Sequence, residues 1–218
     1  MIDDIGFDMK AVRQLADIPA PIAFSILPFS PRCADACAYL HGRQKDILLH
    51  LPMEPHGYPE TSPGKGALYV SMDEEGIIGQ LAEDLALVPC ASGANNHMGS
   101  RFMEDAGRLE MVMAELKKRG LFFIDSRTSP RTAGKEAALR MAIPFAERDI
   151  FIDHDPGYQA AMAALRKASN QPATGDKPLL LIGHPRKETI RAIQDVLPEW
   201  GKKGIKIVRV RECLDHAK

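Results

Sequence analysis

Short apolar runs alternate with longer amphipathic stretches along the chain. The apolar runs hold few charges, and several are closed by proline or glycine, as is typical of buried strands. They predict strands at residues 22–27, 46–51, 90–95, 121–125, 145–151, 178–183 and 205–210. Residues 1–4 resemble the tail of a further strand. The amphipathic stretches predict helices that begin near residue 30 and cover residues 71–87, 105–119, 135–141, 155–168 and 187–203.

Alternation of strand and helix is typical of a parallel α/β architecture. Seven or eight such units favour a barrel over an open sheet, and no GxGxxG sequence follows the first strand to indicate a dinucleotide fold. We therefore predict a single domain over residues 1–218 with a parallel barrel.

Local signals predict where some helices and loops begin. Ser30 and Pro31 are the residue types expected at an N-cap and at the first helical position. Ser71 is expected to cap a helix that has acids in its first turn. The segment from Met53 to Ser71 is polar and rich in Pro and Gly, and its length favours a functional loop over a plain connection.

Composition narrows the classes of function. Apolar residues make up 45% and charged residues 26% of the 218 residues, and the net charge is -1. This near-neutral balance argues against a nucleic-acid partner. No apolar run approaches the roughly 20 residues that span a bilayer, so we expect no membrane contact by this segment. The first ten residues lack a signal peptide, and the strand-like start leaves open an upstream segment that carries an export signal or an anchor.

The four cysteines do not form a recognisable framework. Cys33 and Cys37 lie four residues apart on a predicted helix, while Cys90 and Cys213 are isolated. No CxxC or zinc-ribbon spacing is present. We therefore expect these residues to pack as small apolar side chains rather than to bind metal.

Polar residues follow five of the predicted strands. They are Asp3 with Asp4, His50, His97, Asp125 and His184. All strand carboxyl ends share one face of a parallel barrel, and that face carries the active site, so these side chains are predicted to converge.

The residue types suit metal-dependent hydrolysis. Zinc takes imidazole nitrogens and carboxylate oxygens, and a catalytic site keeps one position open for water. The metal lowers the pKa of that water and polarises a substrate carbonyl. A remaining carboxylate is able to accept a proton and a remaining histidine to return it to a leaving amine.

Each of these residues also has a structural explanation. Adjacent acids often form a turn or a helix cap, and neighbours on a strand point to opposite faces, so Asp3 and Asp4 share a site only if the chain bends there. His50 fits a hydrogen-bonded core histidine, His97 loop packing, and Asp125 a cap. His184 fits a turn. The recurrence at five strand ends favours the common site.

Other polar residues give weaker signals. Glu54 and His56 are candidates for further ligands or supporting groups because they follow His50 closely. His154, between two aspartates, is better explained as part of a helix N-cap. Three arginines follow the strand-end residues and would suit an anionic sugar, although exposed arginine is commoner; they are Arg101, Arg127 and Arg186.

Five segments together resemble the divergent polysaccharide deacetylase family. They occur in the order of that family and span almost the whole chain, at residues 1–6, 49–55, 95–102, 123–126 and 182–185. The resemblance implies a distorted (β/α)7-type barrel, like that of the distantly related NodB-type carbohydrate esterases. It also implies a divalent metal, most often zinc, and removal of acetyl groups from N-acetylated sugar polymers. Because the family is typical of bacterial envelopes, we expect a periplasmic or envelope location.

The resemblance also assigns roles to residues. Asp3 corresponds to the general base, Asp4 to a metal ligand and His184 to the general acid. The family relatives supply two further ligands from a His-x-x-x-His motif, but here the residue four positions after His50 is Glu54. His97 is then the candidate for the second histidine ligand, and Asp125 remains a further catalytic candidate.

Three functions are compatible with these features. The first is a metal-dependent deacetylase of an amino-sugar polysaccharide or cell-wall glycan, and the second is a small-substrate amidase with the same residues. The third is an envelope carbohydrate-binding or accessory protein without catalysis. Aromatic residues are only 6% of the chain, with one Trp, so the sequence reveals no sugar-stacking platform, which counts against a binder of long polymers.

Overall fold

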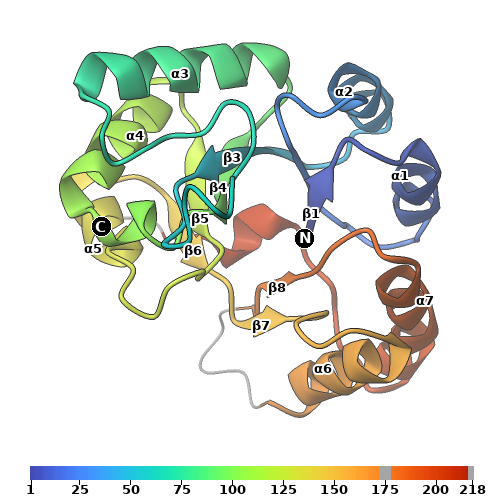
Figure 1. Cartoon of the computed structure of the whole chain (residues 1–218). Coiled ribbons are helices and arrows are strands. Elements are labelled where there is room, and N and C mark those ends of the chain that lie inside the picture. The colour runs from blue at the N-terminus through green and yellow to red at the C-terminus, as the bar shows by residue number, and fades with distance from the viewer. Residues whose placement is uncertain (172–177, 216–218) are drawn as a thin grey trace.

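Among the residues that the structure describes, eight short parallel strands form the centre of the molecule. The computed structural model describes residues 1–171 and 178–215, and Figure 1 shows the strands surrounded by helices. Six strands pair in chain order: β1 (Ile2–Ile5), β2 (Phe24–Ile26), β3 (Ile47–Met53), β4 (Gly93–Met98), β5 (Phe122–Asp125) and β6 (Phe145–Glu147). A second pair consists of β7 (Ile150–Phe151) and β8 (Leu181–Ile182). A parallel bridge from Ile2 to Gly183 connects β1 to the end of β8, so the strands form a distorted barrel, as predicted.

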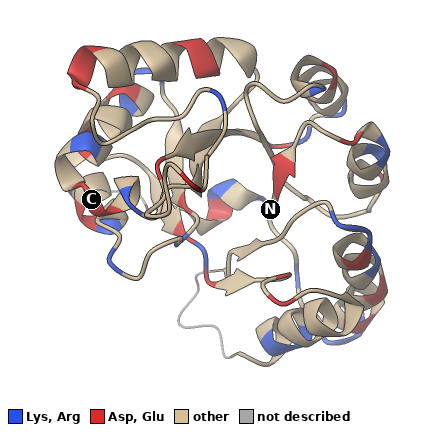
Figure 2. Ribbon diagram, in the orientation of Figure 1, with Lys and Arg blue, Asp and Glu red and all other residues tan. Residues whose placement is uncertain are grey.

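Seven helices cover the described strands. They are α1 (Met9–Ala16), α2 (Cys33–Gly42), α3 (Glu74–Leu87), α4 (Ala106–Lys118), α5 (Gly134–Met141), α6 (Tyr158–Asn170) and α7 (Lys187–Lys202). Two short 3-10 helices are η1 (Phe102–Glu104) and η2 (Val210–Cys213). All seven residues of β3 are buried, as expected for a strand enclosed on both faces. Figure 2 shows most charged residues on helices and loops, and acids on β1 are among the few on strands. No helix in the described parts is long and apolar enough to cross a membrane.

Several predicted boundaries were wrong. Helix α2 begins at Cys33, because the Ser30 hydroxyl donates to the carbonyl of Leu27 instead of capping. Asp73 rather than Ser71 caps α3, since its carboxylate accepts from the backbone N–H of Gly76. Helix α6 begins only at Tyr158, and α1 was not predicted at all.

The strand predictions need three corrections. Strand β4 extends to Met98, so His97 lies within it. The run at residues 145–151 forms two strands, because the backbone N–H of Arg148 turns to the carbonyl of Asp125. Residues 205–210 form no strand; residues 205–209 are irregular and η2 begins at Val210. Their apolar side chains instead line a pocket of about 360 Å³ with Leu180 and Trp200.

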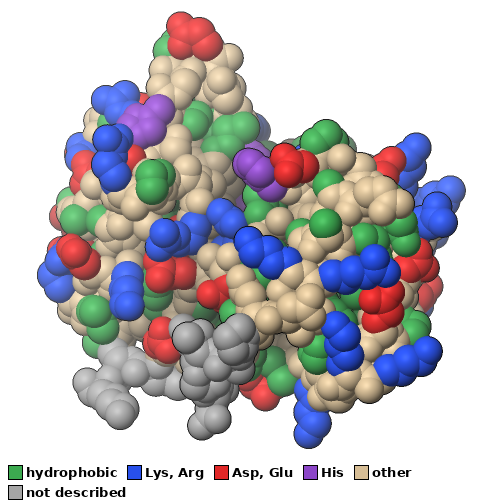
Figure 3. All heavy atoms as spheres, turned by 90° about the horizontal axis from the view of Figure 1, so that it is seen from below, with side chains coloured by type: hydrophobic (Ala, Val, Ile, Leu, Met, Phe, Trp, Pro, Cys, Tyr) green, Lys and Arg blue, Asp and Glu red, His purple; other side chains and the backbone are tan. Residues whose placement is uncertain are grey.

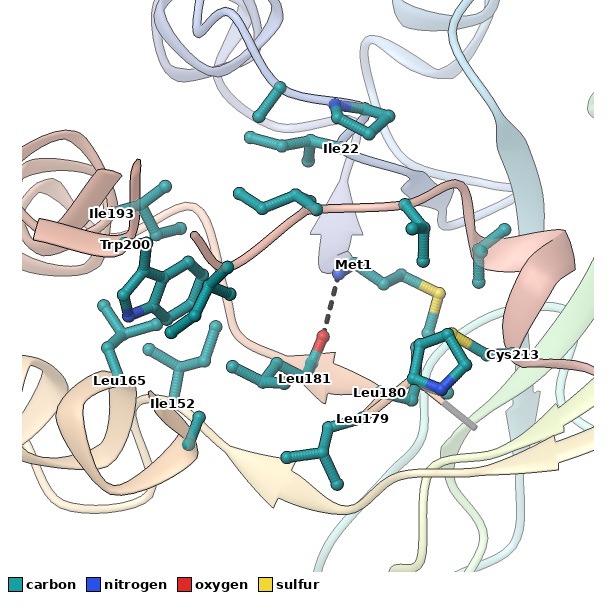
Figure 4. A pocket seen from close by; sticks show the side chains of 18 of the residues that line it. Met1, Ile22, Ile152, Leu165, Leu179, Leu180, Leu181, Ile193, Trp200 and Cys213 are labelled. Carbon is teal, nitrogen blue, oxygen red and sulfur yellow. Dashed lines mark hydrogen bonds between the residues drawn. The ribbon is translucent and has the colours of Figure 1, made fainter. Parts of the chain in front are cut away.

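This apolar pocket lies at the amino-terminal ends of the strands. Figure 4 shows Met1, Ile22 and Leu181 around it, and the Met1 amino group donates to the carbonyl of Leu181 at 2.8 Å. The candidate strand-end residues are not among its lining residues, since they occupy the carboxyl ends of the same strands. The two ends of the barrel therefore differ sharply in polarity.

A disulfide joins Cys37 on α2 to Cys90, just before β4, and this corrects the expectation that the cysteines act only as packed apolar side chains. Cys33 and Cys213 are buried, as expected. The bonded cysteines are 53 residues apart in sequence, so the bond closes a large loop around β3 and α3.

We predict that the double variant Cys37→Ala/Cys90→Ala loses about 3 kcal/mol of free energy of unfolding, because the unfolded chain gains the entropy of the opened loop. Urea unfolding without reductant measures this loss. The matched control is Cys33→Ala, which removes a buried thiol on the same helix and leaves the disulfide intact. A double variant as stable as the wild type would contradict a stabilising cross-link.

Candidate metal centre

The end of β1 is bent so that two adjacent acids face the same centre. Asp4 has a φ of 54° and Gly6 a φ of 126°, both in the left-handed region. The register of β1 against β2 also shifts between Ile2 and Ile5. A Cβ on Gly6 would lie 1.8 Å from the Ser30 hydroxyl oxygen, so glycine is required for this turn. The bend overcomes the alternation of a regular strand, which would separate Asp3 from Asp4.

Three side chains from three strands meet beside this bend. Asp4 Oδ1 lies 3.3 Å from His50 Nε2 and 3.1 Å from His97 Nδ1, and these two nitrogens are 3.1 Å apart. His50 pairs in register with Asn95, and His97 follows Asn95 by two positions on β4, so both histidines share one face of the sheet. The structure thus brings Asp4, His50 and His97 together, as the sequence predicted.

These three atoms fit the ligand set of a divalent metal. A tetrahedral zinc with bonds of about 2.0–2.2 Å separates its ligand atoms by about 3.3 Å, close to the observed spacing. Asp4 Oδ1 is buried, and no described donor makes a hydrogen bond to it despite the two close nitrogens. A cation shared by the three atoms would satisfy this carboxylate oxygen, and a carboxylate with two imidazoles is a donor set that zinc accepts.

The buried amide of Asn95 orients the candidate ligand His50 as well as Asp3. Its Nδ2 lies 3.1 Å from each Asp3 oxygen, and because a carboxylate only accepts, this end must be the amide nitrogen. Asn95 Oδ1 then faces His50 Nδ1 at 3.1 Å, so Nδ1 carries the proton and Nε2 presents its lone pair to the centre. Hydroxyls complete the amide's contacts, with Ser25 donating to Oδ1 and Ser126 accepting from Nδ2.

His184 lies on the other side of Asp4. Its Nε2 is 3.6 Å from Asp4 Oδ2, and its Nδ1 is 3.0 Å from Asp153 Oδ1. Asp153 Oδ2 accepts from the backbone N–H of His184 at 2.8 Å and from the Thr189 hydroxyl at 2.7 Å. These bonds hold the imidazole so that Nε2 faces the centre. The sequence analysis missed Asp153, whose signal was its place directly after a weak strand.

The pKa values of the two adjacent acids shift in opposite directions. Burial raises the pKa of the Asp3 carboxyl, although His50 and His184 act in the opposite direction. Burial also opposes ionisation of Asp4, but its contacts with His50 and His97 outweigh this and hold its pKa far below the ordinary value. Burial disfavours protonated His184, yet Asp153 outweighs it and raises the pKa of that imidazole. Asp3 therefore has the character of a base and His184 that of an acid.

Asp125 is placed differently from the other strand-end residues. It is fully buried, and its carboxylate accepts from the Arg127 backbone N–H and from the Thr132 hydroxyl, both at 2.6 Å. Burial raises the pKa of this carboxyl. These contacts organise the turn after β5, as its capping alternative required, and a catalytic role for Asp125 stays a prediction.

The weaker candidates have other partners. Glu54 is buried, pairs with Arg101 at 2.8 Å and accepts from the Val70 backbone N–H at 2.7 Å. His56 is exposed and lies 3.1 Å from Glu104. These contacts point to a structural role in the loop after β3.

The remaining weak candidates lie along the rim. Arg127 pairs with Glu147 at 2.8 Å, and Arg186 donates to the carbonyl of Asp153 at 3.1 Å. His154 is exposed and precedes α6 by several residues, so the N-cap explanation was wrong.

The barrel thus carries, at the carboxyl ends of its strands, an Asp–His–His group with the spacing to hold a metal ion, and comparison with known proteins identifies the family. Residues 1–214 match the divergent polysaccharide deacetylase family, and the chain belongs to that family. The Escherichia coli K12 protein YibQ is 28% identical over 197 residues, which cover 90% of this chain and 61% of YibQ. The chain thus spans about three fifths of that relative's length.

Solved structures support the fold. The protein ATU2773 of Agrobacterium tumefaciens C58 superposes with a TM-score of 0.89 at 25% identity, over 96% of this chain and 85% of that one. A family 4 carbohydrate esterase of Streptomyces lividans, solved with acetate, has a TM-score of 0.56 at 10% identity, over 100% and 94%. BA3943 of Bacillus anthracis, described as a family 4 pseudoenzyme, has a TM-score of 0.59 at 10% identity, over 98% and 63%. The last two share the fold alone.

We predict that purified protein holds about one zinc per chain and that His50→Ala and His97→Ala abolish it, because each removes one of three protein ligands. Elemental analysis of the three proteins measures the metal. His41→Ala, which changes an exposed histidine on α2, should retain the wild-type content. A wild type without metal after zinc is added back would rule out this centre.

We also predict that Asn95→Ala weakens zinc binding by about 10- to 100-fold, because His50 loses the acceptor that sets its tautomer. Competition with a chromogenic chelator measures the dissociation constant. Asn96→Ala is the matched control, since Asn96 is equally buried but its side chain bonds to Met98, Thr128 and the Ser126 backbone instead of to a candidate ligand. Equal weakening in both variants would argue for a general loss of structure instead.

Proposed function

We propose that this protein is a metal-dependent hydrolase that removes N-acetyl groups from an amino-sugar polysaccharide or cell-wall glycan. The observation that carries the proposal is the placement of Asp3 and His184 on either side of the Asp4–His50–His97 group. Asp3 Oδ2 is 3.8 Å from His50 Nε2, and His184 Nε2 is 3.6 Å from Asp4 Oδ2. A base and an acid thus flank the position where an acetyl carbonyl would bind.

The proposed mechanism assigns one task to each side chain. Asp4, His50 and His97 would hold a divalent cation such as zinc, which when bound supplies Lewis acidity toward the acetyl carbonyl and water. Asp3, oriented by Asn95, accepts the proton of the attacking water. His184, held by Asp153, donates a proton to the nitrogen of the leaving amine through Nε2.

A carbohydrate-binding or accessory protein is the second candidate. It is favoured by the fold likeness to a family 4 pseudoenzyme and by Glu54, which stands where the family relatives have the second histidine of their motif. Glu54 bonds to Arg101 and Val70, so it leaves the ligand role to His97. The retained acid and base groups favour catalysis over this alternative.

An envelope location fits both candidates. Disulfides persist in oxidising compartments such as the bacterial periplasm and are rare in the cytosol. The Cys37–Cys90 bond therefore supports the location that the family membership suggests.

We expect Asp3→Asn to lower acetate release from N-acetylglucosamine oligomers by about 10²- to 10⁴-fold while zinc content stays unchanged, because only the proton acceptor is lost. Enzymatic detection of acetate and elemental analysis give the two readouts. Asp35→Asn, at an exposed acid on α2, is the control. Wild-type protein that holds zinc and binds the oligomers without releasing acetate would favour the accessory role.

A further inference from the structure

The exposed large apolar side chains are aliphatic in some parts of the barrel and aromatic in others. The aliphatic ones that the structure describes lie away from the metal centre: Leu87 ends α3, Leu139 is on α5 and Ile207 borders the apolar pocket. The aromatic ones are Phe7 and Tyr58, exposed by 61% and 40%. Both follow strands that carry candidate ligands, Phe7 after β1 and Tyr58 after β3, and so lie on loops of the active-site face.

Exposure alone does not identify a binding site. Leu139 is 62% exposed, and single apolar side chains on a surface are normal. Figure 3 shows such side chains scattered among charged ones on the face seen from below. Phe7 and Tyr58 differ because they are aromatic and because they stand on the rim of the proposed active site.

The loop that carries Phe7 is held firmly on both sides. Gly6 packs against Ser30, and its carbonyl accepts from the backbone N–H of Arg32 at 2.8 Å. On the other side Asp8 caps α1 through the backbone N–H of Lys10 at 2.8 Å. Phe7 follows Asp4 by three positions, so their Cα atoms are at most about 11 Å apart. The ring is therefore presented to solvent on a fixed loop beside the metal centre, which lowers the ordering cost of binding.

Tyr58 is supported by a second ring and an anchored loop. Its ring centroid is 4.8 Å from that of Tyr69. The loop is fixed at its base by a backbone bond of 2.9 Å from Leu68 N–H to the Pro52 carbonyl. The His56 backbone N–H also donates to the Ser100 hydroxyl at 3.0 Å. The buried Glu54 also fixes this loop through its bond to the Val70 backbone N–H. The loop therefore positions Tyr58 and supplies no candidate ligand.

The rim is continuous between these two aromatic residues. The loop after β2 contacts both neighbouring loops, because Ser30 packs on Gly6 and Phe29 packs on Gly66. The Lys65 ammonium lies 4.4 Å from the centroid of the Phe29 ring. Aromatic rings pack against the apolar face of a sugar ring and leave its hydroxyls in water, which suits this exposed rim.

We propose that Phe7 and Tyr58 stack against sugar rings next to the reacting residue, so that the site takes a residue within a glycan chain in preference to a free monosaccharide. The inference rests on the proposed function only for the reaction at the metal centre, since stacking itself needs no catalysis. It also revises the expectation from composition, because few aromatics suffice when they stand on the rim.

Titration calorimetry with N-acetylglucosamine and its β-1,4-linked tetramer tests the proposal. Each measurement uses the zinc-loaded chain with Asp3→Asn, so that the sugar is not consumed. We expect the tetramer to bind more tightly than the monosaccharide. Phe7→Ala and Tyr58→Ala should each weaken tetramer binding about tenfold and leave the monosaccharide unchanged, because only the flanking contacts are lost.

Two further variants serve as controls. Leu139→Ala removes an equally exposed apolar side chain from α5 and should bind the tetramer as the parent does. Tyr58→Phe keeps the ring and should retain affinity. Thermal unfolding by circular dichroism verifies that all the variants fold.

The outcomes separate this proposal from the proposed function. Aromatic variants that bind the tetramer like Leu139→Ala, or a parent that does not bind it, would overturn the stacking proposal. If Phe7→Ala and Tyr58→Ala release acetate from the tetramer as fast as the wild type does, the stacking proposal is also overturned. The proposed hydrolase function is then unaffected. Tetramer binding that depends on both rings, without any acetate release by the wild type, would support stacking and refute catalysis.

Discussion

The left-handed turn at Asp4 is the constraint on which the site depends. A regular strand would send Asp3 and Asp4 to opposite faces, and one of them would be lost to the helical layer. With Asp4 at a φ of 54°, its carboxylate instead reaches His50 and His97, while the Asp3 carboxylate contacts Asn95. Such a conformation costs a non-glycine residue about 1 kcal/mol or more and persists only where its surroundings enforce it. Gly6, packed against Ser30, and the paired strands supply that enforcement.

Asn95 makes the two functions of the centre interdependent. One amide bonds to the proposed base through Nδ2 and to a proposed ligand through Oδ1. A shift of His50 toward or away from a metal would therefore move the group that orients Asp3. Low-dielectric surroundings strengthen such a network and make any unsatisfied member costly, so its parts are expected to move together. Asp153, which follows β7, holds His184 in a separate network.

The sequence was sufficient to predict the α/β barrel and the residues that meet at its carboxyl end, because both follow from where each apolar run stops. Asp4, His50, His97 and His184 needed only the rule that parallel strands end on one face. Asn95 was not recognised, since its importance lies in bonds across strands whose register is set by the whole sheet, and the place of Asp153 after a weak strand was too slight a signal to reveal its bond to His184. The Cys37–Cys90 bond likewise depends on α2 packing beside the turn before β4. The strand predicted at residues 205–210 is absent because an apolar run indicates contact with other apolar groups and not a particular backbone conformation. The apolar side chains of this run line the pocket instead.

Glu54 stands where the His-x-x-x-His motif has its second histidine, and this difference affects the loop after β3. The resemblance to the NodB-type esterases implied two histidines four residues apart, which would tie that loop directly to a metal. Here Glu54 bonds to Val70 and Arg101, and His97 on the neighbouring strand is the candidate for the third ligand position. The three candidate ligands then all lie on strands of one sheet, β1, β3 and β4. The loop is released from ligation but remains anchored by a buried carboxylate, which leaves its outer part free to present side chains to a substrate.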